Sequence, residues 1–181
     1  MPLARFQDLA KEQSFDAVGM VCDTTKGLRR LKGSCVLIAD RYVLAAKHIL
    51  KIDTAFDAAA YRIIFNEQHY QIAAIHPYAE KDHDLMLIEL VDSVKGVRSL
   101  DMCIKNPAVG DTLTMVGYGA LRPSNMMSGN VGIGIRTAAQ NILDSLGDMQ
   151  SDGSALHLYS DFYARDTQRF RSLPLEGMLN G

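Results

Sequence analysis

The amino-acid sequence predicts an all-β protein. Apolar residues occur in short or alternating runs, and Gly, Asp and Asn bound these runs. Short strands separated by turn residues are typical of a β-barrel or a β-sandwich. With 181 residues, of which 48% are hydrophobic and 22% charged, the chain has the length of one ordinary domain or of two small halves. A chain of this size can bury a core.

The first half is expected to form a closed barrel. Its expected strands are residues 17–22, 33–39, 42–46, 61–65, 70–76 and 85–90. We assign residues 15–92 to this first barrel and residues 1–14 to an N-terminal extension. Within the extension, Leu3, Phe6, Leu9 and Ala10 have helical spacing and are expected to serve packing.

The second half contains fewer strand signals. Residues 93–110 are richer in Asp, Lys, Ser and Pro and are interpreted as a connection. Residues 111–181 begin with an alternating strand over 111–119 and pass through a Gly-rich segment. A strand or short helix over 135–143 and a strand over 156–162 follow. We therefore expect a partial, truncated second barrel.

Two residues have the clearest chemical potential. His48 lies near the end of the apolar run 42–50, and Asp84 begins the run 84–90. Near pH 7 a neutral imidazole can take a proton from a hydroxyl, but it needs a carboxylate to fix its tautomer and to stabilise the imidazolium. Either residue alone is more often structural. As a pair at the ends of two buried strands, they are expected to lie within about 2.6 to 3.2 Å of each other.

Three motifs in this order resemble the trypsin-like (chymotrypsin-fold) serine peptidases. The motif around the histidine is Gly33-Ser34-Cys35-Val36-Leu37-Ile38 followed by Val43-Leu44-Ala45-Ala46-Lys47-His48. The motif of the aspartate is Asp84-Leu85-Met86-Leu87-Ile88-Glu89-Leu90. The motif of the second barrel is Gly110-Asp111-Thr112-Leu113-Thr114-Met115-Val116-Gly117-Tyr118-Gly119.

The resemblance implies a chymotrypsin-like double β-barrel and a serine-type endopeptidase. Such an enzyme hydrolyses peptide bonds through an acyl-enzyme and needs no cofactor. His48 would act as general base and then as general acid, and Asp84 would orient it. A peptide or protein is the implied substrate.

The nucleophile is not found within the chain. Residues 136–141, 158–162 and 175–177 resemble bacterial members of the family, in which such a segment leads into Gly-Asp-Ser-Gly-Gly-Pro. The 181 residues contain no Gly-Asp-Ser-Gly. The nucleophile is therefore expected just beyond Gly181, and the resemblance implies that it is a serine. Gly181 would then be the oxyanion glycine or the residue before it. The alternative is a non-catalytic pseudo-protease or a binding or regulatory fragment.

The chain departs from the family pattern beside the histidine. Lys47 stands where the family has a small residue, and Ala45 replaces the usual threonine. Ile49 replaces the cysteine that often follows the histidine, which removes a common disulfide. No Ile-Val-Gly-Gly segment follows a basic cleavage site, so activation by a newly freed N-terminus is not implied.

Other clusters of reactive residues are weaker candidates. His69, His76 and His83 recur every seven residues, but Pro77 interrupts any helix that would align them as metal ligands. We therefore expect no metal site. Ser128-Gly129 and Asp152-Gly153-Ser154 lack the flanking glycines of a nucleophile loop.

The three cysteines, Cys22, Cys35 and Cys103, are odd in number and have no CxxC spacing, so we expect buried apolar residues. Cys35 lies in an apolar run and is a poor candidate nucleophile, because a reactive thiol needs an exposed, electropositive setting.

Composition limits the expected partners. A net charge of −2 without a basic block gives no reason to expect nucleic acid or an anionic membrane as a partner. No apolar stretch reaches the ~18 residues of a membrane-spanning helix. The first residues lack the apolar core of a secretory signal, so export is not expected. Exposed edges of the partial second barrel could associate with a partner.

Overall fold

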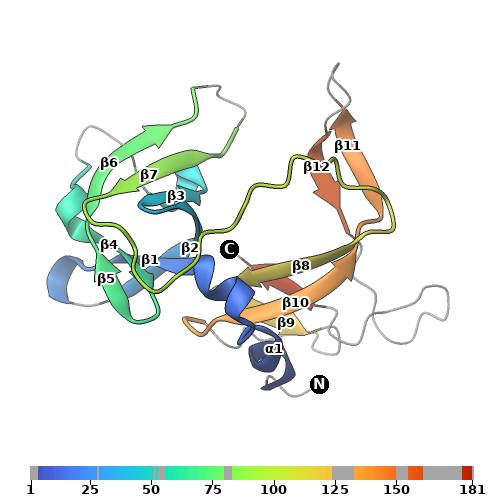
Figure 1. Ribbon diagram of the computed structural model, residues 1–181, viewed down its shortest axis with the longest axis horizontal. Coiled ribbons are helices and arrows are strands. Elements are labelled where there is room, and N and C mark those ends of the chain that lie inside the picture. Colours follow the sequence, from blue (N-terminus) through green and yellow to red (C-terminus); the bar gives the residue numbers. More distant parts are fainter. Residues whose placement is uncertain are drawn as a thin grey trace. The chain divides into compact units, whose positions relative to one another are not determined.

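The computed structural model divides into two compact units. It describes residues 4–27, 29–50, 52, 56–79, 83–123, 133–149, 155–160 and 177–180. One unit comprises residues 11–102, and the other combines residues 1–10 with residues 103–180. Nearly all of the regular structure is β, which confirms the predicted all-β class (Figure 1).

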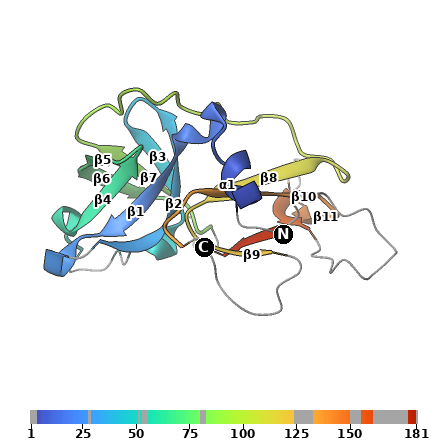
Figure 2. The ribbon, with the colours of Figure 1, turned by 90° about the horizontal axis from the view of Figure 1, so that it is seen from below.

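The unit of residues 11–102 contains one seven-stranded antiparallel sheet. Its strands are β1 (Val18–Asp23), β2 (Arg30–Ala39), β3 (Tyr42–Ala45), β4 (Tyr61–Phe65), β5 (Gln68–Tyr70), β6 (Ile72–Pro77) and β7 (Met86–Leu90). The order across the sheet is β5-β4-β1-β2-β3-β7-β6. Gln71 alone separates the two outer strands β5 and β6 along the chain, so the sheet curls on itself (Figures 1 and 2).

Single-turn 3-10 helices connect several of these strands. They are η1 (Gln13–Ala17), η2 (Thr25–Gly27), η3 (Lys47–Ile49) and η4 (Ala58–Ala60). Of these, η3 contains His48.

The core of this unit lies inside the curled sheet. Alternate residues of β2, β3 and β7 point inward, as the two-residue period of a strand requires. Val43, Met86 and Ile88 are completely buried. The aromatic ring of Phe65, also buried, meets the ring of Tyr70 edge to face, with centroids 6.1 Å apart.

The predicted strands of the first half are confirmed, with shifted ends. The expected strand 70–76 is in fact two strands, because Gln71 leaves the ladder between β5 and β6. The expected strand 17–22 begins one residue later, after η1. Residue 46 lies outside β3, so His48 sits on η3 rather than at a strand end.

The second unit contains shorter sheets, each two-stranded. Its strands are β8 (Thr112–Gly117), β9 (Ala120–Pro123), β10 (Thr137–Ile142), β11 (Ser145–Met149), β12 (Ala155–Tyr159) and β13 (Gly177–Asn180). They pair as β10-β8, β11-β12 and β13-β9, all antiparallel. Figure 2 shows β9 and the C-terminal β13 in this unit.

The segment 135–143, for which the sequence predicts either a strand or a short helix, contains the strand β10. Its residues Thr137, Ala138 and Ala139 are buried. The sequence did not predict β9, β11 and β13, which are short and contain Pro, Gly or Asp. These residues are depleted in strands, so local pattern gives little strand signal there.

The expected N-terminal helix is present as α1 (Ala4–Leu9). It packs against β10, with Phe6 completely buried, and the Arg136 guanidinium donates from Nε to the carbonyl of Ala10 at 3.0 Å. The helix therefore serves packing, as expected. Among the described residues, no helix has the length and apolar character needed to cross a membrane.

Candidate active site

The pairing of β3 with β7 brings His48 and Asp84 together. In the antiparallel ladder Ala45, the last residue of β3, lies opposite Met86, the first residue of β7. The chain just after β3 and the chain just before β7 therefore emerge at the same end of the sheet. Pro77, at the end of β6, pairs with Met86 and lies at that end as well.

The sequence explains why the chain turns after β3. Two polar residues, Lys47 and His48, are followed by two apolar ones, Ile49 and Leu50. The 3-10 turn η3 leaves the imidazole exposed and carries Ile49 and Leu50 into the core, where they are 5% and 2% exposed. Burial of these two side chains favours the turn, whose own backbone bond from the Leu50 N–H to the Lys47 carbonyl is long, at 3.3 Å.

The carboxylate of Asp84 contacts both the side chain and the backbone of His48. Oδ2 lies 2.5 Å from Nδ1 of His48, and Oδ1 accepts the backbone N–H of His48 at 2.9 Å. An ionised carboxylate can only accept hydrogen bonds, so Nδ1 carries the proton. Nε2 then holds a free lone pair and can act as a base.

The contact also sets the charge of Asp84. The hydrogen bond from the His48 side chain holds the pKa of Asp84 below its ordinary value, and the backbone N–H groups of His48 and Lys47 lower it further. Both side chains are about half exposed or more, so solvent weakens the attraction. Asp84 is thus ionised near pH 7, as an orienting carboxylate must be.

A shallow recess of about 360 Å³ adjoins the pair. Its lining residues are Lys47, His48, Leu50, Ile52, Pro77 and Asp84. The Lys47 ammonium lies 3.5 Å from the carbonyl of Tyr78. Sequence reasoning did not assign Leu50, Ile52 or Pro77 to the site, although their positions just after His48 and just before the Asp84 loop were a usable signal.

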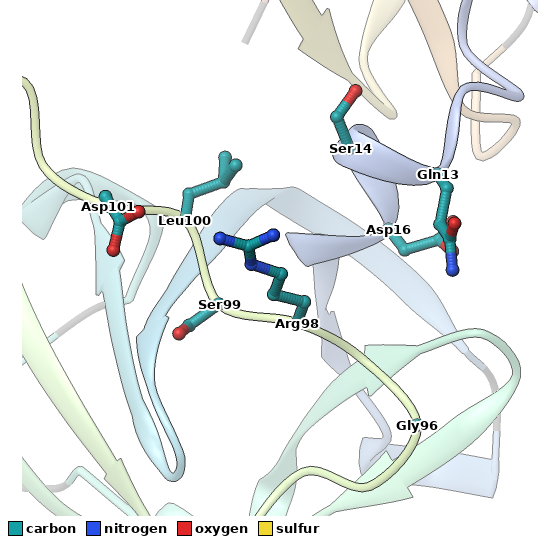
Figure 3. Close-up of a pocket in the computed structure, with 8 residues that line it drawn as sticks. All are labelled: Gln13, Ser14, Asp16, Gly96, Arg98, Ser99, Leu100 and Asp101. Carbon is teal, nitrogen blue, oxygen red and sulfur yellow. The ribbon is translucent and has the colours of Figure 1, made fainter.

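A second hollow of about 420 Å³ lies in the same unit and shares none of these residues. It is lined by Gln13, Ser14, Asp16, Gly96, Arg98, Ser99, Leu100 and Asp101. Figure 3 shows the side chain of Arg98 extending into its middle. No motif in the sequence pointed to this hollow.

The cysteine predictions are partly wrong. Cys22 and Cys35 are buried as expected, and burial raises the pKa of both thiols, which makes them poor nucleophiles. Cys103 is exposed, contrary to expectation, because it lies in a segment outside any strand or helix.

The three spaced histidines lie on different elements. His69 is on β5, His76 is on β6 at 3.6 Å from Glu89, and the ring of His83 meets that of Tyr78 at 5.1 Å. Within the part of the chain that the structure describes, no group of three potential ligands gathers at one point.

Three predicted positions fall outside the described residues. They are the expected oxyanion residue Gly181, the segment Ser128-Gly129 and the segment Asp152-Gly153-Ser154.

Comparison with known proteins identifies the fold and the family. The family model described as Trypsin matches residues 9–145, well over half of the chain. A solved structure of mouse neuropsin, described as a serine protease expressed in the limbic system of the brain, is similar with a TM-score of 0.58 and 18% identity. That alignment covers 84% of this chain and 80% of neuropsin, and the similarity shows the chymotrypsin-like fold. A search of curated proteins finds no match. The chain belongs to the trypsin-like family of serine proteases.

Proposed function

We propose that these 181 residues are the part of a serine-type endopeptidase that carries the general base, His48, and its orienting carboxylate, Asp84. The observation that carries the proposal is the two-point contact of the Asp84 carboxylate with Nδ1 and the backbone N–H of His48. The contact holds the imidazole in one orientation and directs the basic Nε2 away from Asp84. Exposure of the imidazole leaves Nε2 accessible to a nucleophile and a substrate.

The proposed chemistry is acyl transfer. Nε2 of His48 takes the proton of a hydroxyl nucleophile as the oxygen attacks the peptide carbonyl, and the ionised Asp84 stabilises the resulting imidazolium. His48 then gives this proton to the leaving amine, which frees the first product and leaves an acyl-enzyme. Water, deprotonated by the same nitrogen, then attacks the acyl group, and the imidazolium returns the proton to the nucleophile's oxygen as its bond to the second product breaks. No step needs a cofactor.

The nucleophile, we propose, is not among residues 1–181. Support comes from the sequence, which contains no Gly-Asp-Ser-Gly and no other serine flanked by glycines on both sides. In the family that the motifs resemble, a segment like 175–177 leads into such a serine and the oxyanion donors, which supports this proposal. The likeness to bacterial members belongs to the same proposal.

Purified residues 1–181 are therefore expected not to hydrolyse peptide or ester substrates. Loss of the serine removes a factor of about 10⁶ in rate, and each missing oxyanion donor removes about 10² to 10³ more. The assay compares the chain with a matched His48→Ala variant, and both should give the rate of buffer alone. Hydrolysis that His48→Ala abolishes would show that a nucleophile lies within residues 1–181.

The alternative is a non-catalytic binding or regulatory protein. Large exposed apolar side chains in the second unit support it, since such residues can meet a partner. They include Ile104, which is fully exposed, and Leu158 and Tyr159 on β12, which are about half exposed. The coding sequence downstream of Gly181 distinguishes the two. A continuing frame with a Gly-Asp-Ser-Gly segment supports the protease, and a stop codon supports the binding protein.

A further inference from the structure

Ile49 and Gly33 form a close contact directly behind His48. Ile49 follows His48 on η3 and is 5% exposed, and Gly33 lies on β2. A Cβ atom built on Gly33 would lie 2.8 Å from Cγ2 and 3.4 Å from Cβ of Ile49. The Ile49 side chain therefore packs directly on the backbone of β2, in space that a side chain at residue 33 would need.

This contact anchors the turn that carries the imidazole. The three-residue turn η3 has one long backbone hydrogen bond of its own, from Leu50 to Lys47. Besides the contacts with Asp84, its placement therefore depends on side chains that reach the core. Ile49 and Leu50 are those side chains. Of the two, Ile49 belongs to the turn itself and is bonded covalently to His48.

From this geometry we infer that Ile49, seated on Gly33, is a positioning residue for His48. The inference deepens the proposed function and rests on it. The base and its carboxylate come from separate elements: Asp84 precedes β7, whereas η3 is fixed to β2 through Ile49. The contact keeps the imidazole and the N–H of His48 in line with the two oxygens of Asp84. A displacement of about 1 Å would disrupt such a two-point contact.

The pKa of Asp84 reports on the position of η3. It is lowered first by the His48 side chain, and also by the backbone N–H groups of His48 and Lys47, all of which belong to η3. Its value follows from the ¹³C chemical shift of the carboxyl group as a function of pH, measured on the full 181-residue chain. A substitution that only weakens the core would leave this value unchanged while the protein stays folded.

Two substitutions at residue 49 test whether the contact of its side chain with Gly33 positions the turn η3. Ile49→Ala removes the Cγ2 and Cδ1 atoms that lie over Gly33, and we expect the Asp84 pKa to rise toward about 3.9, the value of a free aspartate. Ile49→Val keeps Cβ and both γ carbons, so the wild-type pKa should be retained.

The converse substitution is Gly33→Ala, which deletes nothing from the core. Its new methyl group would meet Cγ2 of Ile49 at 2.8 Å. Cγ2 can move away only by a rotamer change of the buried Ile49 side chain or by a shift of the turn, and Cβ of Ile49 itself lies 3.4 Å from the new methyl group. Because the packed core opposes the rotamer change, we expect the turn to shift and the Asp84 pKa to rise here too. The control is Ile63→Ala, a fully buried residue of β4, which lies two strands from β2 in the sheet. It should lower the melting temperature and leave the Asp84 pKa at the wild-type value.

An unchanged Asp84 pKa in folded Ile49→Ala would overturn the inference. If Ile49→Ala does not fold, Gly33→Ala decides by the same criterion. Failure of the proposed function gives a different result, since the Asp84 pKa would then be ordinary in the wild-type chain and insensitive to His48→Ala. A rise in Ile63→Ala equal to that in Ile49→Ala would also overturn the inference, because the effect would then follow from lost core volume alone.

Discussion

Gly19→Ala is expected to destabilise the unit of residues 11–102 by about 3 kcal/mol, at the upper end of overpacking effects. Gly19 lies on β1, which pairs with β2 on one side and β4 on the other. An added Cβ would lie 2.6 Å from Cε1 of Phe65 and 2.8 Å from the carbonyl oxygen of Ile64. The ring is held in the core and the carbonyl belongs to a paired strand, so neither can move at low cost.

The measurement is urea unfolding followed through backbone amide signals of β1 and β4. A matched control is Gly96→Ala, since Gly96 has a φ of +73° but no atom within 4 Å of an added Cβ. Gly96→Ala should lower the free energy of unfolding by about 1 kcal/mol, because alanine is strained in a left-handed backbone conformation. Equal destabilisation by the two substitutions would contradict the close packing described for Gly19.

Amide hydrogen exchange is expected to differ by at least about 10³-fold between the two units, which corresponds to about 4 kcal/mol in the free energy of opening. Strands β2, β3 and β7 have paired neighbours on both sides and a completely buried core. Strands β8, β10 and β12 each have one partner strand among the described residues. Leu113, Met115 and Val116 on β8 are only half-buried.

The paired reporters for this measurement are Val43 on β3 and Val116 on β8. We expect slow exchange at Val43 and fast exchange at Val116. Equally slow exchange in both units of a monomer would mean that the second unit is as stable as the first, and the non-catalytic alternative would then be the stronger one.

The sequence predicted the first half well because its signals are local. Alternating apolar residues in β2, β3 and β7 follow from the period of a half-buried strand. The turn η3 was not predicted, since His48 was expected at the end of a strand. The approach of His48 to Asp84 was also expected, and the register of Ala45 with Met86 explains it.

What the sequence could not predict depends on contacts between distant residues. The packing of Ile49 on Gly33 joins positions on separate elements, and neither residue is unusual by itself. The same holds for the pairing of β9 with β13, which are far apart along the chain and short. The exposure of Cys103 was missed because the number and spacing of the cysteines say nothing about the position of each one, and its neighbours Met102 and Ile104 are exposed as well.

The most direct test of the proposed His48–Asp84 pair is the pKa of the Asp84 carboxyl group, measured by ¹³C NMR in residues 1–181 and in His48→Ala. We predict a pKa below about 3.9 in the wild type and a higher one in the variant, because the His48 side chain is the largest cause of the lowering. A carboxyl group with a lowered pKa stabilises the fold above its unfolded pKa, and this contribution is lost as the pH falls through the folded value. An ordinary Asp84 pKa in the wild type, unchanged by His48→Ala, would contradict the pairing of base and carboxylate on which the proposed function depends.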